Sequence, residues 1–382
     1  MTYITAHNHT KRYGALRYAV LLAVTILTSL ILPMQIAAEI VIGGNVYGGG
    51  NLGALDGNAN VELKGGTIQG DVFGGARMAD ISGRTYVHIN GEEVCSALIV
   101  KAVYGGNDIS GTIGTGGERP FTTANTTIDN TWNAFVRATK NNDYPVIIGS
   151  LYGGGNGAYD YTPIEGGEGF SVTIGDESYT VNNIPTLGKT YLELNGGIYG
   201  SVFGGGNAAT VTGETVIYAD NSTDINGTLN SIPKTNADIL GLFEGADYTA
   251  SGDNMVFNYH IGRVYGGNNL AEMSIRPTWD LIQSDINNLY SGGNRGDMTY
   301  PNGIAIAIKS DGVRVNNVYG GCRMADVNPG GNIPTGETIY GYNFEPGYAA
   351  RVYITGGKIN NIYGGNDISG DISGSADALP IA

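Results

Sequence analysis

The hexapeptide VYGGGN at residues 46–51 decides the fold, because close copies of it recur along the chain. Each copy places an aliphatic residue, an aromatic residue and two glycines in that order. The aromatic residues of the eight copies are Tyr47, Phe73, Tyr104, Tyr152, Phe203, Tyr265, Tyr319 and Tyr363. Successive copies lie 26 to 62 residues apart. Self-similarity on this scale is typical of repeat proteins and predicts stacked structural units.

The residues before each copy alternate between apolar and polar, as in NVELKGGTIQGDVFGG (60–75) and ARVYITGGKINNIYGG (350–365). This period of two predicts short β-strands, and the paired glycines supply corners. One such unit cannot bury its apolar face, whereas stacked units can. We therefore expect an all-β parallel β-helix, a solenoid with loop insertions, over residues 39–382. A β-sandwich is the alternative, because short strands separated by turn residues also suit that fold.

Three stretches without the repeated phrase are expected to be insertions, at about 119–146, 221–257 and 271–300. Within the third, TWDLIQSDINNLY places four apolar residues at helical spacing: Trp279, Ile282, Ile286 and Leu289. This spacing predicts a short amphipathic helix that lies on the surface of the stacked repeats.

The first 38 residues have the pattern of a secretory signal peptide. Basic residues at positions 11, 12 and 17 precede an uncharged apolar run from Ala19 to Leu32, and the small residues Ala37 and Ala38 close the segment. A basic region, an apolar region and a small-residue region in this order are typical of an export signal. We expect a secreted or cell-surface protein whose remaining residues contain no membrane span.

The charge balance narrows the choice of partners. The net charge of −15 becomes −18 without the signal, with 17 basic residues against 35 acidic ones. Such a surface repels phosphate backbones and anionic lipid, so we expect no nucleic-acid partner. Calcium or a basic partner would suit the acidic surface.

The two cysteines, Cys95 and Cys322, are separated by at least four copies of the phrase. At about 4.8 Å per stacked unit they lie too far apart for a disulfide, which needs Cα atoms within about 7 Å. We expect two free thiols. Neither a Cys-x-x-Cys pair nor a cluster of Cys and His occurs, so no zinc site is expected.

Several polar residues recur because a larger block is duplicated. GGARMADISG (74–83) returns as GGCRMADVNPG (320–330), and GGNDISG (105–111) returns at 364–370. A catalytic site is needed once, whereas a structural corner is needed in every block. We therefore assign structural roles, with ion binding and catalysis as alternatives, to Arg77, Asp80, Asp108, Arg323, Asp326 and Asp367. The Asn residues after the glycines predict an asparagine ladder of Asn51, Asn107, Asn156, Asn207, Asn268 and Asn366.

The aromatic residues of the phrase should form a column. If the preceding aliphatic residue points into the core, a period of two directs the ring outward. A solvent-facing stripe of rings could stack on sugars or dock a partner. The alternative, which we favour because Phe replaces Tyr twice, is that the rings stack only on one another and shield the backbone.

The phrase, the alternating strands and the export signal resemble the glycine-rich β-helical repeats of large secreted surface proteins in Bacteroidetes-type bacteria. Autotransporter passenger repeats and polymorphic outer-membrane protein repeats are more distantly similar. The resemblance implies a non-enzymatic surface protein, either an adhesin or a structural rod, with a glycan or a host surface protein as partner. No residue pair is nominated for catalysis and no cofactor is expected.

Two other functions stay open at this point. One is a polysaccharide lyase or hydrolase built on the same fold, and the other is a repeat rod that calcium stabilises. Strand-like residues at both ends of the repeat region, beginning with EIVIGGNVYGG, also predict end-to-end association or continuation in a longer chain.

Overall fold

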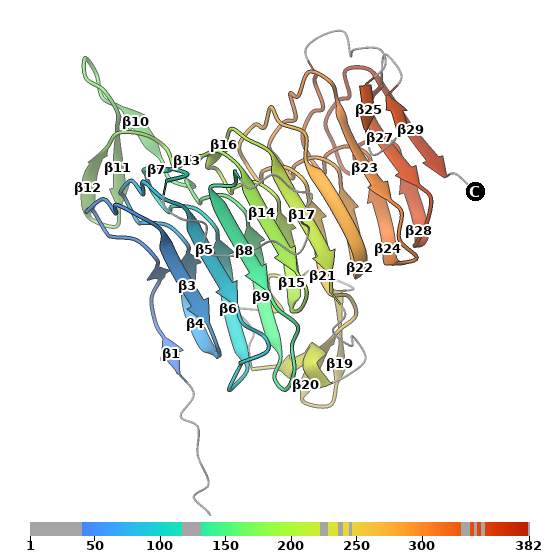
Figure 1. Cartoon of the computed structure of the whole chain (residues 1–382), viewed down its shortest axis with the longest axis horizontal. Helices are drawn as coiled ribbons and strands as arrows, with labels where there is room; N and C mark the ends of the chain where they lie inside the picture. Colours follow the sequence, from blue (N-terminus) through green and yellow to red (C-terminus); the bar gives the residue numbers. More distant parts are fainter. Residues whose placement is uncertain are drawn as a thin grey trace, which may run out of the picture. The chain divides into compact units, whose positions relative to one another are not determined.

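The computed structural model describes residues 40–116, 131–221, 228–235, 240–243, 247–329, 337–339, 342–344 and 348–380 (Figure 1). Residues Ile40–Ala382 form one compact unit. The expected signal peptide lies outside the described residues. The expectation of an all-β chain is confirmed. Apart from strands, the named elements of the described residues include one 3-10 turn, η1 (Thr228–Asn230). Within the described ranges, no helix is long and apolar enough to cross a bilayer.

A sheet of fifteen strands runs through the larger unit, and every strand pair in it is parallel. A sandwich of antiparallel hairpins is therefore wrong for this sheet. Its first layer contains the strands that end on an aromatic residue. They are β2 (Val46–Tyr47), β4 (Gly66–Phe73), β6 (Leu98–Tyr104), β9 (Val146–Tyr152), β15 (Ile198–Phe203), β21 (Ile261–Tyr265), β22 (Thr278–Tyr290), β24 (Gly312–Tyr319) and β28 (Lys358–Tyr363), with β1 (Val41–Ile42) beside β4.

A second layer of the same sheet pairs in parallel in the order β3–β5–β8–β14–β17–β22. Here β22 contributes its first half, whereas its second half belongs to the first layer. The strands are β3 (Ala59–Leu63), β5 (Thr85–Ile89), β8 (Ala134–Ala138), β14 (Thr190–Leu194) and β17 (Thr215–Asp220). A separate parallel sheet contains β23 (Ile304–Ile308), β27 (Tyr348–Ile354) and β29 (Ser375–Pro380).

A third row of short pairings joins the stretches that follow the aromatic phrase. Its strands are β7 (Thr112–Ile113), β13 (Thr186–Leu187) and β16 (Thr210–Val211), all parallel. Isolated parallel bridges extend the row at both ends, for example Leu55 to Ile81 and Val327 to Ile372. A repeat is the chain around one aromatic position, and most junctions between adjacent repeats therefore contain three parallel pairings. In the described part of the chain, no such pair joins β22 to β23 or β16 to Met273.

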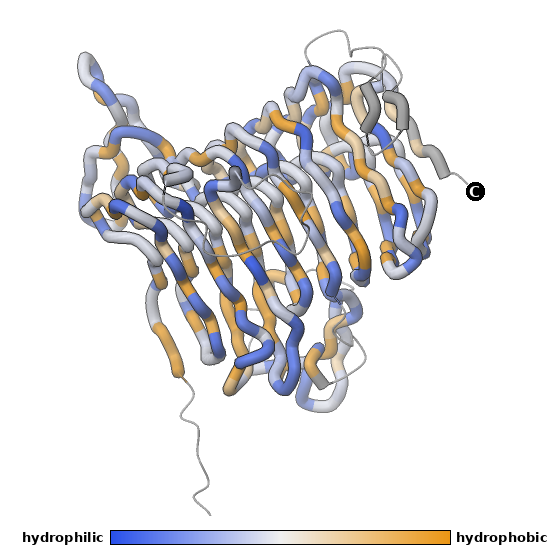
Figure 2. Tube along the Cα trace, in the orientation of Figure 1, coloured by the Kyte–Doolittle hydropathy of each residue, from blue (hydrophilic) through white to orange (hydrophobic). Residues whose placement is uncertain are grey.

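The hydrophobic core lies between the layers. Val72 and Val103 of the first layer share one cluster with Val87 and Val136 of the second. The residue before the aromatic position is 0% exposed in seven repeats: Val72, Val103, Leu151, Val202, Val264, Leu289 and Val318. Burying one such side chain stabilises the fold by about 1.5–3 kcal/mol. Figure 2 shows the apolar and polar residues alternating along the strands.

Glycine pairs make the corners that lead into the first layer. Gly65 and Gly66, before β4, have φ angles of 134° and 95°. The equivalent Gly197 and Gly357 have φ angles of 89° and 85°. These values lie in the left-handed region that favours glycine, which explains why Gly-Gly recurs before the strands.

Antiparallel sheets occur outside the parallel sheets. One contains β10 (Tyr161–Pro163), β11 (Phe170–Ile174) and β12 (Glu177–Val181). The expected insertion at 221–257 contains β18 (Ser231–Pro233), β19 (Tyr248–Ser251) and β20 (Asn254–Phe257), and its Phe243 and Phe257 pack on Ile147 and Ile198. A two-stranded pair contains β25 (Glu337–Ile339) and β26 (Tyr342–Phe344).

The expected helix at 278–290 is wrong, because these residues form the thirteen-residue strand β22. Trp279 and Leu281 are buried in the second layer, Ile286 and Leu289 in the first, and Ile282 between them is 39% exposed. A strand that crosses from one layer to another changes the phase of its apolar residues, and the result imitates helical spacing. Residues 271–300 therefore belong to the repeats and are not an insertion.

The boundaries of the expected insertion at 119–146 also need correction. Residues 134–138 form β8, which lies between β5 and β14 in the second layer. Val146 begins β9 of the first layer. Residues 119–130 lie outside the described part of the chain.

Candidate functional site

Nine aromatic rings stack in one column, which we call the aromatic ladder. Neighbouring ring centroids lie 4.6–5.0 Å apart, with interplanar angles of 2–12°. The separation matches the distance of about 4.8 Å between parallel strands, so equivalent residues of adjacent repeats meet face to face. The members in order are Tyr47, Phe73, Tyr104, Tyr152, Phe203, Tyr265, Tyr290, Tyr319 and Tyr363.

The sequence leaves two arrangements open for the rings, a solvent-facing stripe and a column in which the rings stack only on one another. The solvent-facing stripe is wrong. The seven rings from Phe73 to Tyr319 are only 1–8% exposed, because each is covered on both faces by its neighbours. Tyr363, at one end of the ladder, is 46% exposed. Burial raises the pKa of Tyr152 and of Tyr319 to about 12. These phenols are therefore neutral at physiological pH.

Tyr290 is the member that the sequence search misses. It belongs to LYSGGN (289–294), in which Ser291 replaces the first glycine of the phrase. Its ring stacks between Tyr265 and Tyr319 at 4.7 and 4.8 Å. A search that tolerates one substitution in the phrase would find it.

A second column, the polar ladder, contains the residue four positions after each ring. Its members are Asn51, Arg77, Asp108, Asn156, Asn207, Asn269, Asn294, Arg323 and Asp367. Side-chain amides link the central members, with Nδ2 of each residue donating to Oδ1 of the one before at 2.7–2.9 Å, from Asn156 to Asn294. Asn156 also donates to Asp108 at 2.9 Å. The amides therefore run along the stack and hold each repeat in register with the next.

The polar ladder contains the order Asn, Arg, Asp twice, in the first three and the last three repeats. Arg77 donates to Oδ1 of Asn51 at 3.0 Å, and Arg323 donates to Oδ1 of Asn294 at 3.3 Å. Asp108 is 1% exposed and accepts bonds from the hydroxyls of Tyr47 and Tyr159, both at 2.8 Å. The duplicated residues thus join different repeats to one another.

The expected ladder of six asparagines divides into two columns. Asn51, Asn156 and Asn207 belong to the polar ladder, whereas the other three lie one position nearer the ring. Each of these three accepts a backbone N–H of the preceding repeat at 2.7–2.8 Å and donates to a backbone carbonyl at 3.1 Å: Asn107, Asn268 and Asn366. They close the turn after the phrase through main-chain bonds.

Asp80 and Asp326 hold the third row together. Oδ1 of Asp80 accepts the backbone N–H and the hydroxyl of Thr112, at 2.7 and 2.9 Å. Oδ1 of Asp326 accepts the backbone N–H of Asp371 at 2.7 Å. Both carboxylates bind the backbone of the following repeat.

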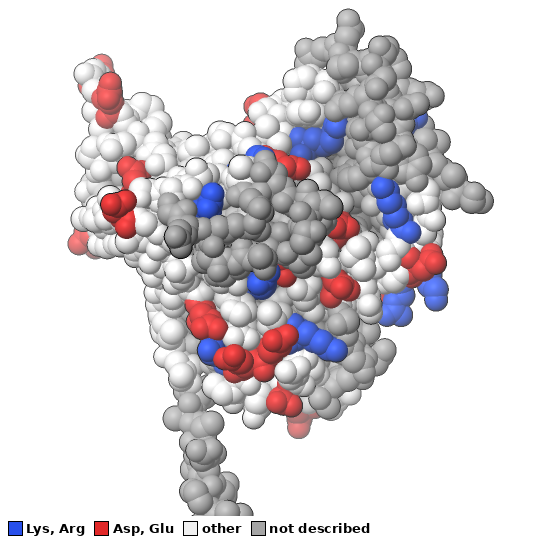
Figure 3. Space-filling view, viewed as in Figure 1, with Lys and Arg blue, Asp and Glu red and all other residues white. Residues whose placement is uncertain are grey.

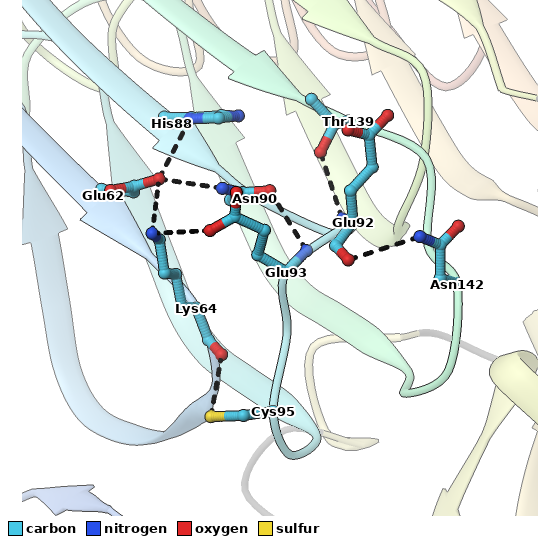
Figure 4. Close-up of polar contacts among 9 residues, drawn as sticks. All are labelled: Glu62, Lys64, His88, Asn90, Glu92, Glu93, Cys95, Thr139 and Asn142. Carbon is cyan, nitrogen blue, oxygen red and sulfur yellow. Dashed lines mark hydrogen bonds and ion pairs between the residues drawn. The ribbon is translucent and has the colours of Figure 1, made fainter.

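A cluster of titratable groups lies on the second layer, around Glu62 and His88 (Figure 4). Oε1 of Glu62 accepts a hydrogen bond from Asn90 at 2.8 Å, and this bond lowers the pKa of Glu62. Nδ1 of His88 lies 3.5 Å from the same oxygen, and burial lowers the pKa of the imidazole. A carboxyl group that acts as a general acid needs a raised pKa, which is the opposite of the shift at Glu62.

Lys64, beside this cluster, is paired at the surface. Nζ of Lys64 lies 2.8 Å from the carboxylate of Glu93, and both side chains are largely exposed. Surface pairs of this kind contribute about 0–1 kcal/mol. On the described part of the face in Figure 3, acidic and basic side chains are interspersed rather than gathered into a basic patch.

Two of the cavities contain carboxylates that could contact a ligand. One of about 270 Å³ lies between β22 and β23 and is lined by one carboxylate, Asp280, beside Trp279 and Lys309. The other, of about 370 Å³, contains Asp56 and Asp80. Asp56 accepts a bond from Ser82 at 2.8 Å, and Asp80 binds Thr112. Neither cavity directs two unengaged carboxylates at one point.

The described residues contain no group of three or more His, Cys, Asp or Glu side chains placed to hold a metal ion. Cys95 is exposed and Cys322 is buried, and both thiols are free, as the sequence predicts. Burial raises the pKa of Cys322 to about 12.

Comparisons with known proteins assign no family. The chain matches no family model, no curated protein and no solved structure.

Proposed function

We propose that the chain is an exported, non-enzymatic repeat protein, built as a parallel β-helix, that serves as a structural or adhesive rod at the bacterial cell surface. The resemblance to glycine-rich surface repeats supports this function. The three parallel pairings that recur at most junctions between repeats support the solenoid.

One observation carries the proposal: the repeated side chains bind neighbouring repeats. The rings of the aromatic ladder stack on one another, and the amides of the polar ladder bond along the stack. Asp80 and Asp326 bind the backbone of the following repeat. Residues used in this way build a long, stable scaffold, which favours a structural role over catalysis.

The partner we propose is a glycan or a host surface protein, with end-to-end association as a second kind of contact. The net charge of −18 without the signal favours a basic protein surface over nucleic acid or anionic lipid. No cofactor is part of the proposal. Calcium stabilisation remains the alternative for the rod, and it requires a melting temperature that rises in millimolar calcium.

Export is tested with the full chain expressed in a Gram-negative host. We expect a product outside the cytoplasm that begins near Glu39. The control variant Leu22→Arg places a charge inside the apolar run and should leave the intact chain in the cytoplasm. An unprocessed cytoplasmic product from the natural sequence would contradict the proposal.

Function is tested by applying the exported protein to an array of glycans and host surface proteins and to a panel of polysaccharides. We expect saturable binding without the release of reducing ends or unsaturated sugars. Polysaccharide cleavage that persists through purification would instead establish the enzyme alternative.

A further inference from the structure

The backbone bonds between adjacent repeats follow one pattern. At the last junction, the N–H groups of Gly320 and Gly321 donate to the carbonyls of Tyr363 and Gly365, at 2.8 and 3.1 Å. In the opposite direction, the N–H groups of Asp367 and Ile368 donate to the preceding repeat at 3.0 and 2.9 Å. Each junction thus contains two bonds in each direction.

The same four bonds join the third repeat to the fourth. Gly105 and Gly106 donate forward to Tyr152 and Gly154 at 2.9 and 3.0 Å. The N–H groups of Asn156 and Gly157 donate backward at 2.9 and 2.8 Å, to the carbonyls of Asn107 and Asp108. The pattern therefore belongs to the repeat and not to one pair of strands.

The backbone groups that form this junction are present at the two ends of the stack, one set at each end. Among the described residues, four groups at the carboxyl-terminal end have no partner: the N–H of Gly364, the N–H of Gly365, and the carbonyls of Asn366 and Asp367. At the amino-terminal end the unpartnered groups are the carbonyls of Tyr47 and Gly49 and the N–H groups of Asn51 and Leu52. Donors at one end therefore correspond to acceptors at the other.

The side chains at the two ends also match an existing junction. The ninth phrase, IYGGND, repeats the third, VYGGND, and the first phrase, VYGGGN, repeats the fourth, LYGGGN. Between the third and fourth repeats, Asn156 donates to Asp108 at 2.9 Å, and Tyr104 stacks on Tyr152 at 4.6 Å. Asn51 and Asp367 could form the same bond, and Tyr47 and Tyr363 the same stack.

Exposed apolar side chains mark both ends. Ile368 is 58% exposed, whereas the equivalent Ile109 is 1% exposed because it packs on Val172 and Val181 of the β10–β12 sheet. Leu52, at the same position of the first repeat, is 63% exposed. Tyr363 is 46% exposed, against 5% for the equivalent Tyr104. A further repeat placed on the carboxyl-terminal end would cover the open face of the Tyr363 ring, as Tyr152 covers Tyr104.

We infer that the carboxyl-terminal end of one copy binds the amino-terminal end of a second copy, in the register of the junction between the third and fourth repeats. The inference rests on the proposed function, because loss of residues 1–38 frees the end that begins at Ile40. Main-chain pairing supplies the affinity, and the aromatic and polar ladders supply the register. Contacts between unlike ends do not close, so copies add into filaments.

The test uses full chains with a protease site introduced between Ala38 and Glu39, so that the leader is removed whether or not export occurs. Cys95→Ser is the background, because Cys95 is exposed. In filaments of this register, Asn51→Cys of one chain lies beside Asp367→Cys of the next. We expect a disulfide-linked dimer when the two variants are mixed and oxidised, and none from either variant alone.

Two results would overturn the inference. One is the absence of a cross-link from the mixture at concentrations where the chains associate, and the other is cross-linking of a single variant, which would mean that like ends meet. Thr210→Cys, at an exposed position of β16 in the fifth repeat, replaces Asn51→Cys in the negative control.

A second measurement uses sedimentation of charged variants. Leu52→Lys or Ile368→Lys should weaken association at least tenfold. Leu270→Lys is the matched control, because Leu270 occupies the same position of an interior repeat and is 42% exposed. Chains that stay monomeric at every concentration, while circular dichroism shows a strand-rich fold, would refute the contact and leave the proposed rod intact.

Discussion

The hydroxyl of Tyr47 donates to the carboxylate of Asp108 at 2.8 Å, although the two residues are 61 positions apart. The ring belongs to the first repeat and the carboxylate to the third. Tyr290 and Asp367, in the seventh and ninth repeats, make the same bond at 2.8 Å. Each bond spans the repeat between its two ends, so it ties three successive repeats together at the turn that follows the aromatic phrase.

Asp108→Asn should destabilise the protein by about 3 kcal/mol. The buried carboxylate accepts bonds from Tyr47, Asn156 and Tyr159, and the amide nitrogen of Asn would face a donor instead. A hydrogen bond to a charged group contributes about 1.5–3 kcal/mol. Urea denaturation, followed by circular dichroism, measures the loss.

Asp367→Asn is the matched control for this substitution. Asp367 occupies the equivalent position but is only partly buried, and no residue corresponding to Asn156 follows it among the described residues. Asp367→Asn should lower the free energy of unfolding by roughly half as much as Asp108→Asn, because water can replace the missing acceptor. Equal effects of the two substitutions would show that burial at Asp108 is not what makes its bonds important.

Tyr152→Ala should destabilise the protein by about 3–5 kcal/mol, the usual result of removing a large buried ring. The ring is stacked between Tyr104 and Phe203 at 4.6 and 4.7 Å. Tyr152→Phe should cost less than about 1 kcal/mol, because it keeps both ring contacts. Tyr363→Ala, at the exposed end of the ladder, is the control and should have a small effect. Thermal denaturation ranks the three variants, and a large loss in Tyr152→Phe would contradict a stacking role.

The parallel β architecture could be predicted from the sequence because it is repeated. VYGGGN and the alternating residues before it mark the first-layer strand of each repeat, and they recur along the chain. Parallel stacking of the repeats is the arrangement that agrees with every copy. The phrase says little about the second layer. AFVRA at 134–138, which forms β8, carries no glycine phrase, so the sequence alone predicts an insertion there.

The spacing of apolar residues also gives a wrong prediction where a strand crosses from one layer to the other. In β22 the apolar residues alternate in one phase at Trp279 and Leu281 and in another at Ile286 and Leu289. The change of phase depends on where the strand bends, and that is set by the repeats on either side. The hydrophobic period of this one segment therefore does not reveal where the strand bends.

The residues of the polar ladder were visible in the sequence, but their grouping was not. Counting from the glycines places Asn107 beside Asn156, whereas counting from the ring separates them. The ring is the better origin because it stacks in register with every neighbour, while the number of glycines after it varies. A fixed offset of four from the ring recovers all nine members.

The thiols should differ sharply in reactivity. Cys95 is exposed, whereas Cys322 is 0% exposed and burial raises its pKa to about 12. Because the thiolate is the reactive form, a thiol reagent at pH 8 should label one cysteine per folded chain and two in denaturant. Cys95→Ser should abolish labelling of the folded protein. Rapid reaction of Cys322 without denaturant would mean that the turn of the eighth repeat opens.

Stability should fall as the pH rises from about 10 to 12, because buried phenols resist ionisation. Burial raises the pKa of Tyr152 from 10.0 to about 12. In the unfolded chain the phenol loses its proton near pH 10, so above that pH the unfolded state binds fewer protons and is favoured. Ionisation of Tyr152 therefore removes up to about 3 kcal/mol of stability: the loss begins near pH 10 and is complete once the pH passes 12.

Urea denaturation at pH 8 and at pH 11 measures this loss, and Tyr152→Phe identifies its source. Because Phe has no proton to lose, the variant should lose less stability than the natural chain between the two values. Tyr144→Phe is the control, since Tyr144 is 42% exposed and lies outside the aromatic ladder. It should behave as the natural chain does. If Tyr152→Phe and Tyr144→Phe lose stability equally on going to pH 11, the alkaline transition does not arise from the buried ladder.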